Sequence, residues 1–137
     1  FKFRPLSEYE IITKLKEKSF DNVIIEKVVS FFKKCEMIND VVFTKGWITS
    51  RLNKPIGLRR IRQELKEKGV ADEIIAAQIT RIKPNYDELE AVNKVVQKRL
   101  KTYRGLDRVT IHRRLEGYLL RRGFSTETVY KIIKLLN

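Results

Sequence analysis

The sequence is poor in the residues that most often build catalytic or metal sites. Its 137 residues include one histidine, His112, and one cysteine, Cys35. A metal site or a histidine-based catalytic triad therefore lacks a second member. A lone cysteine cannot form an internal disulfide, so we expect Cys35 only to pack, and we expect His112 to lie at the surface or between helices. Neither enzymatic activity nor a bound cofactor or metal is expected.

Long apolar runs are also lacking. No stretch approaches the roughly 20 apolar residues that a membrane span needs, and no signal-peptide pattern is present. We therefore expect a cytoplasmic protein. Because 42% of the residues are hydrophobic, the chain has enough apolar surface to bury a core. It starts at Phe1 rather than at a methionine, which leads us to expect further sequence upstream.

Proline and glycine are few, at three and six residues, and apolar residues recur three or four positions apart. This pattern predicts an almost wholly α-helical chain. Ser7 and Glu10 form a capping-box pattern that starts a helix over 7–18, Asp21 caps a second helix, and a third begins at Asn39 or Asp40. The core positions expected in these helices are Ile11, Ile12, Leu15, Ile24, Ile25, Val28, Val29, Phe32, Val42, Phe43, Trp47, Ile48 and Leu52.

A helix-ending motif occurs three times. It reads Leu-Lys-Glu-Lys-Ser-Phe at 15–20, Leu-Lys-Glu-Lys-Gly-Val at 65–70 and Leu-Leu-Arg-Arg-Gly-Phe at 119–124. We expect Gly69 and Gly123 to adopt the left-handed conformation that ends a helix, with the next apolar residue folding back onto that helix. Ser19 stands where the other copies have glycine, which predicts a strained or differently shaped first turn.

The repetition extends beyond this motif. Trp47, Arg51 and Leu52 are echoed by Val95, Arg99 and Leu100. We predict three repeats of short helices, over 1–53, 54–104 and 105–137, of which the last contains two helices. The expected fold is an all-α, elongated, curved array of tandem three-helix repeats, in which each repeat mainly contacts its neighbours.

The charge is strongly positive. Thirty Lys and Arg residues stand against 17 Asp and Glu residues, a net charge of +13, which favours nucleic acid or an acidic protein as partner. Two arginine-rich stretches, 51–68 and 98–123, carry nearly all of it. One basic helix is explained by solubility alone, but two such stretches favour binding, because arginine makes bidentate contacts with phosphate and carboxylate. The expected contact residues are Arg59, Arg60, Arg62, Lys66, Arg99, Lys101, Arg104, Arg113, Arg114, Arg121 and Arg122.

Two other sets of residues have a simpler interpretation. Tyr103 lies near Lys101 and Arg104, but its spacing favours packing over base stacking. Several carboxylates fall at predicted helix starts, where the helix dipole favours negative charge, so capping explains them better than acid–base catalysis. They are Glu8, Glu10, Asp40, Asp87, Glu88 and Glu90.

The chain resembles the RecX family, which regulates the bacterial recombinase RecA. The resemblance covers essentially the whole chain and rests on the following segments: Arg4-Pro-Leu-Ser-Glu-Tyr-Glu10, Ile38-Asn-Asp40 with Phe43, Gly57-Leu-Arg-Arg-Ile-Arg-Gln-Glu-Leu-Lys-Glu-Lys-Gly-Val70, and Leu119-Leu-Arg-Arg-Gly-Phe-Ser125. Ser19 departs from the glycine usual in the family, and an N-terminal portion of the longer members is absent.

The resemblance implies a binding partner and an inhibitory or modulating effect on that partner. It implies a monomer that lies in the groove of the RecA filament on single-stranded DNA and inhibits or modulates recombinase and co-protease activity in DNA repair and the SOS response. It transfers no active-site residue. Two alternatives remain: a general basic helical DNA-binding protein, and a scaffold for acidic proteins. Against base-specific reading, no run of Asn, Gln and Arg opens a candidate recognition helix.

Overall fold

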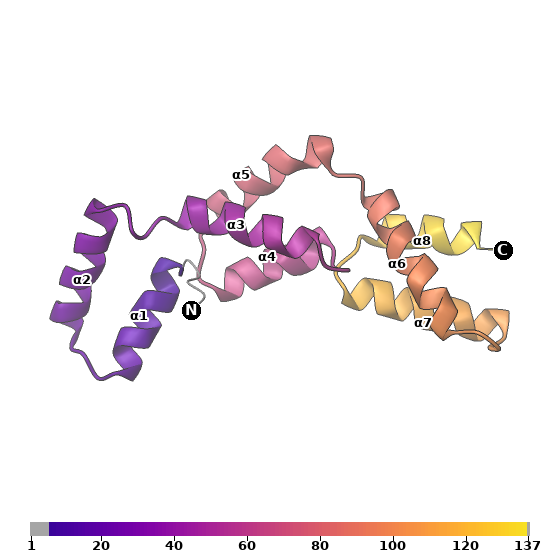
Figure 1. Cartoon of the computed structure of the whole chain (residues 1–137), viewed down its shortest axis with the longest axis horizontal. Coiled ribbons are helices and arrows are strands. Elements are labelled where there is room, and N and C mark those ends of the chain that lie inside the picture. The colour runs from indigo at the N-terminus through magenta and orange to yellow at the C-terminus, as the bar shows by residue number, and fades with distance from the viewer. Residues whose placement is uncertain (1–5, 137) are drawn as a thin grey trace. The chain divides into compact units, whose positions relative to one another are not determined.

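A computed structural model of the chain describes residues 6–136 (Figure 1). These residues form eight α-helices and one 3-10 segment and contain no β-strand, which confirms the all-α prediction for this part of the chain. The helices are α1 (Glu8–Glu17), α2 (Asn22–Lys34), α3 (Asp40–Leu52), α4 (Leu58–Glu67), α5 (Asp72–Ile82), α6 (Glu88–Thr102), α7 (Arg108–Arg121) and α8 (Thr126–Leu135), with the 3-10 segment at Lys83–Asn85. None of them is long and apolar enough to span a membrane.

The chain divides into two compact units. The first compact unit comprises Phe1–Thr49 and Gln63–Arg81, and the second comprises Ser50–Arg62 and Ile82–Asn137. A small apolar cluster around Ile25 and Val29 lies in the first unit, whereas α6, α7 and α8 enclose a larger core in the second, around Val92, Leu115 and Phe124. The division of the sequence into repeats at 53/54 and 104/105 stays a prediction.

Short polar side chains start the helices. The Ser7 hydroxyl accepts a hydrogen bond from the Glu10 amide, and the Glu10 carboxylate accepts one from the Ser7 amide, so the predicted capping box is present. Asp21 caps α2 as predicted. Of the two candidates for the start of α3, Asn39 accepts from the amides of its first turn. Asp40 instead accepts from the Glu8 amide, 3.0 Å away, which links the starts of α1 and α3.

The helix-ending motif has one geometry in all three copies. Gly69 and Gly123 have φ of 77° and 89°, as predicted, and Ser19 has φ of 66°. In the first copy, the Ser19 amide donates to the Lys16 carbonyl and the Phe20 amide to the Leu15 carbonyl, the bonding pattern of a helix closed by a left-handed residue. The first turn is therefore strained, because serine carries a Cβ, but it keeps the common shape.

The apolar residue that follows the turn behaves differently among the copies. Val70 and Phe124 are 5% and 1% exposed, so each closes onto a core as predicted. Phe20 is 45% exposed, so the residue after the turn is not buried in the first copy. The apolar cluster of Ile25, Val29 and Ile38 in the first compact unit does not include Phe20. The apolar residue after the turn becomes buried only where a core lies nearby, and the local motif does not supply one.

Three further expectations about burial are corrected. Ile24 and Val42 are 44% and 58% exposed, although both were expected in the core. Each precedes a buried residue, Ile25 or Phe43, and a helix that packs on one side buries only a narrow stripe. Cys35 is exposed at the C-terminal end of α2, so it has no packing role. By contrast, Tyr103 is buried, as its spacing predicted.

A close contact between backbones joins α4 to α7 within the second compact unit. The Gly57 amide donates to the Arg122 carbonyl over 2.7 Å, and the Arg59 amide donates to the Gly123 carbonyl over 3.2 Å. A Cβ on Gly57 would lie 2.6 Å from the carbonyl carbon of Gly123. A Cβ on Gly123 would lie 2.5 Å from the Arg60 nitrogen. The absence of both side chains lets the start of α4 sit on the end of α7.

The same kind of junction occurs within the first compact unit, between the start of α1 and the end of α4. The Ser7 hydroxyl donates to the Lys68 carbonyl over 2.8 Å. A Cβ on Gly69 would lie 2.5 Å from Cγ of Tyr9. Ser7 and Gly57 are fifty residues apart, as are Leu15 and Leu65, which begin two copies of the helix-ending motif. Each therefore lies at the same distance before its copy. In both junctions the N-terminus of one helix meets carbonyls at the C-terminus of another, which aligns their dipoles favourably.

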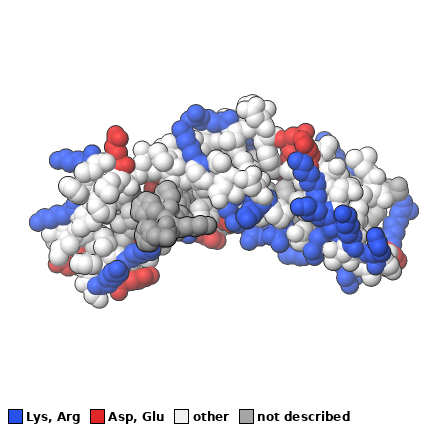
Figure 2. Space-filling view, viewed as in Figure 1, with Lys and Arg blue, Asp and Glu red and all other residues white. Residues whose placement is uncertain are grey.

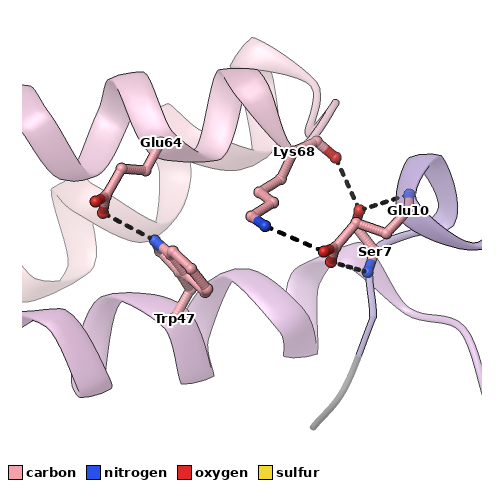
Figure 3. A network of polar contacts seen from close by, with 5 residues as sticks. All are labelled: Ser7, Glu10, Trp47, Glu64 and Lys68. Atoms are coloured by element: carbon pink, nitrogen blue, oxygen red, sulfur yellow. Dashed lines mark hydrogen bonds and ion pairs between the residues drawn. The ribbon is translucent and has the colours of Figure 1, made fainter. Parts of the chain in front are cut away.

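Polar side chains reinforce this second junction (Figure 3). Lys68 Nζ lies 3.1 Å from the Glu10 carboxylate and 5.2 Å from the centre of the Trp47 ring. The indole nitrogen of Trp47 donates to Glu64 over 3.2 Å. The labelled side chains thus link α1, α3 and α4 around one lysine.

Replacing Gly57 by alanine tests the contact between α4 and α7. Gly57→Ala forces backbone atoms apart, and overpacking of this kind costs about 1–3 kcal/mol of unfolding free energy. Gly46→Ala is the matched control, because nothing lies within 4 Å of a Cβ there. Gly46 is inside α3, so alanine stabilises by about 0.5–1 kcal/mol. Urea unfolding of both variants measures the difference, and equal midpoints would contradict the contact.

Replacing Ser19 by glycine tests the strain in the first turn. Ser19→Gly removes a Cβ from a left-handed residue and is expected to stabilise the chain by about 1 kcal/mol. The control is Ser50→Gly inside α3, where glycine destabilises by about 0.5 kcal/mol. Thermal unfolding should show shifts of opposite sign. A loss of stability in both variants would mean that the turn is unstrained.

Candidate polyanion-binding surface

The positive charge is concentrated in one compact unit. The second unit has 18 Lys and Arg against 6 Asp and Glu, a net charge of +12, whereas the first has 12 against 11, a net charge of +1. On the face drawn in Figure 2, basic side chains gather over α6 and α7. Ten of the eleven predicted contact residues lie in the second unit, and Lys66 lies in the first.

Helix α4 presents its basic residues on the outer side of an amphipathic helix. Ile61 and Leu65 are fully buried, whereas Arg59, Arg62 and Lys66 are exposed along the neighbouring face. These three residues form an exposed basic ridge on α4. Arg60 is also exposed.

Helix α7 is built in the same way. Leu115 and Leu119 are fully buried, and Arg113, Arg114 and Arg121 are exposed. At the end of α6, Lys101 and Arg104 are exposed as well. None of Arg59, Arg62, Arg113 and Arg114 forms an ion pair with another described residue, so their charges are available to a partner.

The junction of α4 with α7 brings four arginines together. Backbone hydrogen bonds place Arg59 beside Gly123, and Gly57 beside Arg122. Arg60 follows Arg59 in the sequence and Arg121 precedes Arg122, so both also lie at this junction. Although α4 and α7 lie far apart in the sequence, their arginines share one small region. The amino-acid sequence alone does not reveal this grouping, because its signal is the pair Gly57 and Gly123, which becomes informative only when the two segments are in contact.

Two of the predicted contact residues are half-buried rather than exposed. The Arg99 guanidinium lies 4.2 Å from the centre of the Tyr118 ring, and the Arg122 guanidinium lies 5.1 Å from it. Arg99 is also 5.5 Å from the Tyr103 ring. Cation–π packing holds both guanidinium groups in place, so these arginines are preorganised, whereas Arg59, Arg62, Arg113 and Arg114 are exposed and form no ion pair with another described residue.

Acidic side chains accept hydrogen bonds at the N-terminal ends of helices in this unit. Asp87 caps α6, and Glu88 accepts hydrogen bonds from the amide and the hydroxyl of Ser125, the N-cap of α8. Hydrogen bonds from the Thr110 hydroxyl and amide lower the pKa of Asp107, which caps α7. No group of three or more His, Cys, Asp or Glu side chains able to hold a metal occurs among residues 6–136. The surface is thus suited to binding anions.

Comparisons with known proteins give a consistent result. A family model described as "RecX, second three-helix domain" matches residues 39–77, which hold most of α3–α5, and one described as "RecX, third three-helix domain" matches residues 86–133, over α6–α8. Among curated relatives, the regulatory protein RecX of Clostridium acetobutylicum is 34% identical over 93% of this chain. That of Amycolatopsis mediterranei is 32% identical over 96%, and that of Prosthecochloris aestuarii is 32% identical over 92%.

The matched share of these relatives varies. The chain spans 61% of the C. acetobutylicum protein, 75% of the A. mediterranei protein and 81% of the P. aestuarii protein. A crystal structure of regulatory protein RecX is similar with a TM-score of 0.84 and 25% identity, over 96% of this chain and 64% of that one. RecX from Lactobacillus salivarius has the same fold, with a TM-score of 0.80 and 19% identity, over 98% of this chain and 87% of that one.

The unpaired arginines predict a graded dependence on salt. With oligo-dT as the probe, each phosphate neutralised adds about 0.7 to the slope of log affinity against log salt concentration. Replacing Arg59 and Arg62 by glutamine should therefore lower the slope by about 1.4 if each meets one phosphate. Lys14→Gln with Lys16→Gln, on exposed positions of α1, is the control and should leave the slope unchanged. An equal effect of the two pairs would show that only net charge matters.

Proposed function

The chain belongs to the RecX family of regulatory proteins, and from this premise we propose that it binds the RecA–single-stranded DNA filament and inhibits or modulates the recombinase and co-protease activities of RecA in DNA repair and the SOS response. The observation that carries the proposal is the similarity to RecX proteins over more than nine-tenths of the chain. The family is non-enzymatic, so the activity proposed is one of binding, without a cofactor.

The proposed mechanism is occupancy. The chain acts as a monomer in the bacterial cytoplasm and lies along the groove of the filament, where it covers neighbouring RecA subunits. Strand exchange and cleavage of a repressor are blocked because the surfaces that they need are covered, and filament loss is accelerated. The charge of the second compact unit supports this proposal, since arginines without ion pairs suit both DNA phosphates and acidic patches on a protein.

Direct binding to bare DNA is expected to be weak and sensitive to salt. The exposed arginines of α4 and α7 offer contacts with the phosphate backbone, which carry affinity but no sequence information. The same contacts would support the alternative, a general basic DNA-binding protein. The two functions differ in whether RecA itself is recognised.

Inhibition of RecA distinguishes the two functions. The chain is added at substoichiometric and stoichiometric amounts to RecA on single-stranded DNA, and ATP hydrolysis and strand exchange are measured. We expect inhibition beyond the level that competition for DNA explains. The quadruple variant with Arg59, Arg62, Arg113 and Arg114 changed to glutamine should inhibit less, and the variant with Lys14 and Lys16 changed to glutamine should inhibit fully. Loss of inhibition on addition of excess bare single-stranded DNA would favour the general DNA-binding protein.

A further inference from the structure

The second compact unit contains a cavity of about 530 Å³. Its wall is formed by the segment that links α3 to α4, by one face of α6 and by parts of Tyr86, Tyr118 and Phe124. This volume lies within the range of roughly 300–1,000 Å³ that is usual for ligand sites. The exposed ridges of α4 and α7 do not line it, so apart from Arg99 the cavity is distinct from the surface proposed to meet DNA.

Two buried polar atoms in the lining residues lack a hydrogen-bond partner. They are Nε of Arg99 and the hydroxyl of Tyr86. Burial, and to a lesser extent the charge of Glu88, raise the pKa of Tyr86 to about 12, so its hydroxyl keeps its proton and is able to donate. A buried donor without an acceptor carries a cost in stability, because it has lost water without gaining a partner. An acceptor oxygen bound in the cavity would recover that cost.

The charged residues that line the cavity are all basic. Lys54, Lys94 and Lys98 line it together with Arg99, and none of the described residues that line it is acidic. Lys94 forms an exposed ion pair with Glu90, at 3.5 Å, whereas Lys54 and Lys98 form none within residues 6–136. The cavity therefore favours an anion, and stacking of Arg99 on Tyr118 leaves the in-plane donors of its guanidinium group free for bidentate pairing.

The aromatic and aliphatic residues of the cavity wall favour a protein segment over a nucleic acid as the ligand. Phe124 is buried, and Tyr118 has the guanidinium groups of Arg99 and Arg122 over its ring, so neither ring offers an open face to a base. Base stacking supplies much of the affinity in single-strand binding sites. The apolar part of the wall also includes Leu52 and Val95, which are half-buried and suit an aliphatic side chain of a ligand.

We propose that this cavity binds an acidic and aliphatic segment of a protein partner. A carboxylate of the segment pairs with Arg99 and accepts a hydrogen bond from Tyr86, the lysines at the cavity attract further acidic residues, and a neighbouring aliphatic side chain rests on Leu52 and Val95. This inference rests on the proposed function only in identifying the partner as the recombinase. It assigns the cavity to the protein and the ridges of α4 and α7 to the DNA.

The test uses a short fluorescent peptide of alternating Asp and Leu, whose binding to the whole chain is followed by anisotropy. Lys98→Glu should weaken binding about tenfold, which corresponds to about 1.4 kcal/mol. Lys101→Glu is the matched control, because both lysines are exposed on α6 and only Lys98 lines the cavity. Lys101→Glu should leave peptide binding unchanged but weaken binding of oligo-dT. Equal effects of the two variants on the peptide would overturn the proposal.

Tyr86→Phe supplies a readout that does not depend on charge. Removing an unpaired buried hydroxyl should raise the thermal midpoint of the free chain, and the loss of a donor to a carboxylate should weaken peptide binding about tenfold. A stabilised variant with unchanged peptide affinity would overturn the proposal. So would displacement of the peptide by oligo-dT from a chain with Lys101 changed to glutamate, since that would place nucleic acid in the cavity.

The outcomes separate this inference from the proposed function. If the peptide binds as described while RecA activity is unaffected by the chain, the proposed function fails and the cavity remains a site for acidic segments. If RecA is inhibited but Lys98→Glu and Tyr86→Phe leave both inhibition and peptide binding unchanged, the cavity proposal fails alone. An alternating Ser and Leu peptide that binds as tightly as the acidic one would also overturn it, because charge would then play no part.

Discussion

The close approach of backbones at helix ends is the constraint on which the rest of this structure depends. A helix that ends on a left-handed residue turns its last carbonyls outward, where they need donors. At Arg122 and Gly123 these donors are the amides of Gly57 and Arg59. Amides and carbonyls come this close only where no Cβ intervenes, which is why Gly57 and Gly123 face each other. In the other junction, the Ser7 hydroxyl supplies the donor to the Lys68 carbonyl.

The junction also determines where charge can gather. Because α4 and α7 bury Ile61, Leu65, Leu115 and Leu119, their arginines face solvent, and the contact between the two helix ends sets the positions of those arginines relative to one another. The C-terminal end of α7 has a partial negative charge that favours nearby cations. Arg121 and Arg122 lie at that end. The backbone contact that joins the two helices therefore also brings four arginines together in the second compact unit.

Features of the fold that depend on neighbouring residues could be predicted from the sequence. Contacts between distant segments could not. Ser7, Asp21, Gly69 and Gly123 act within a few residues of themselves, so their roles followed from spacing alone. The exposure of Phe20 depends on how much core lies near the first turn, which no local pattern encodes. For the site, the exposed ridges followed from helical periodicity. The packing of Arg99 on Tyr118 required two helices in contact, and its residues carried no separate signal.

The concentration of positive charge in the second compact unit lowers the stability of its fold. A net charge of +12 on so few residues repels itself, and the six acidic side chains in this unit include helix caps at Asp87 and Asp107. Arg59, Arg62, Arg113 and Arg114 therefore remain uncompensated within residues 6–136. A polyanion that binds the folded unit more tightly than the unfolded chain relieves this repulsion and adds to the stability of the fold. Folding and recognition are coupled in this way, because the junction that concentrates the arginines is also part of what the bound anion stabilises.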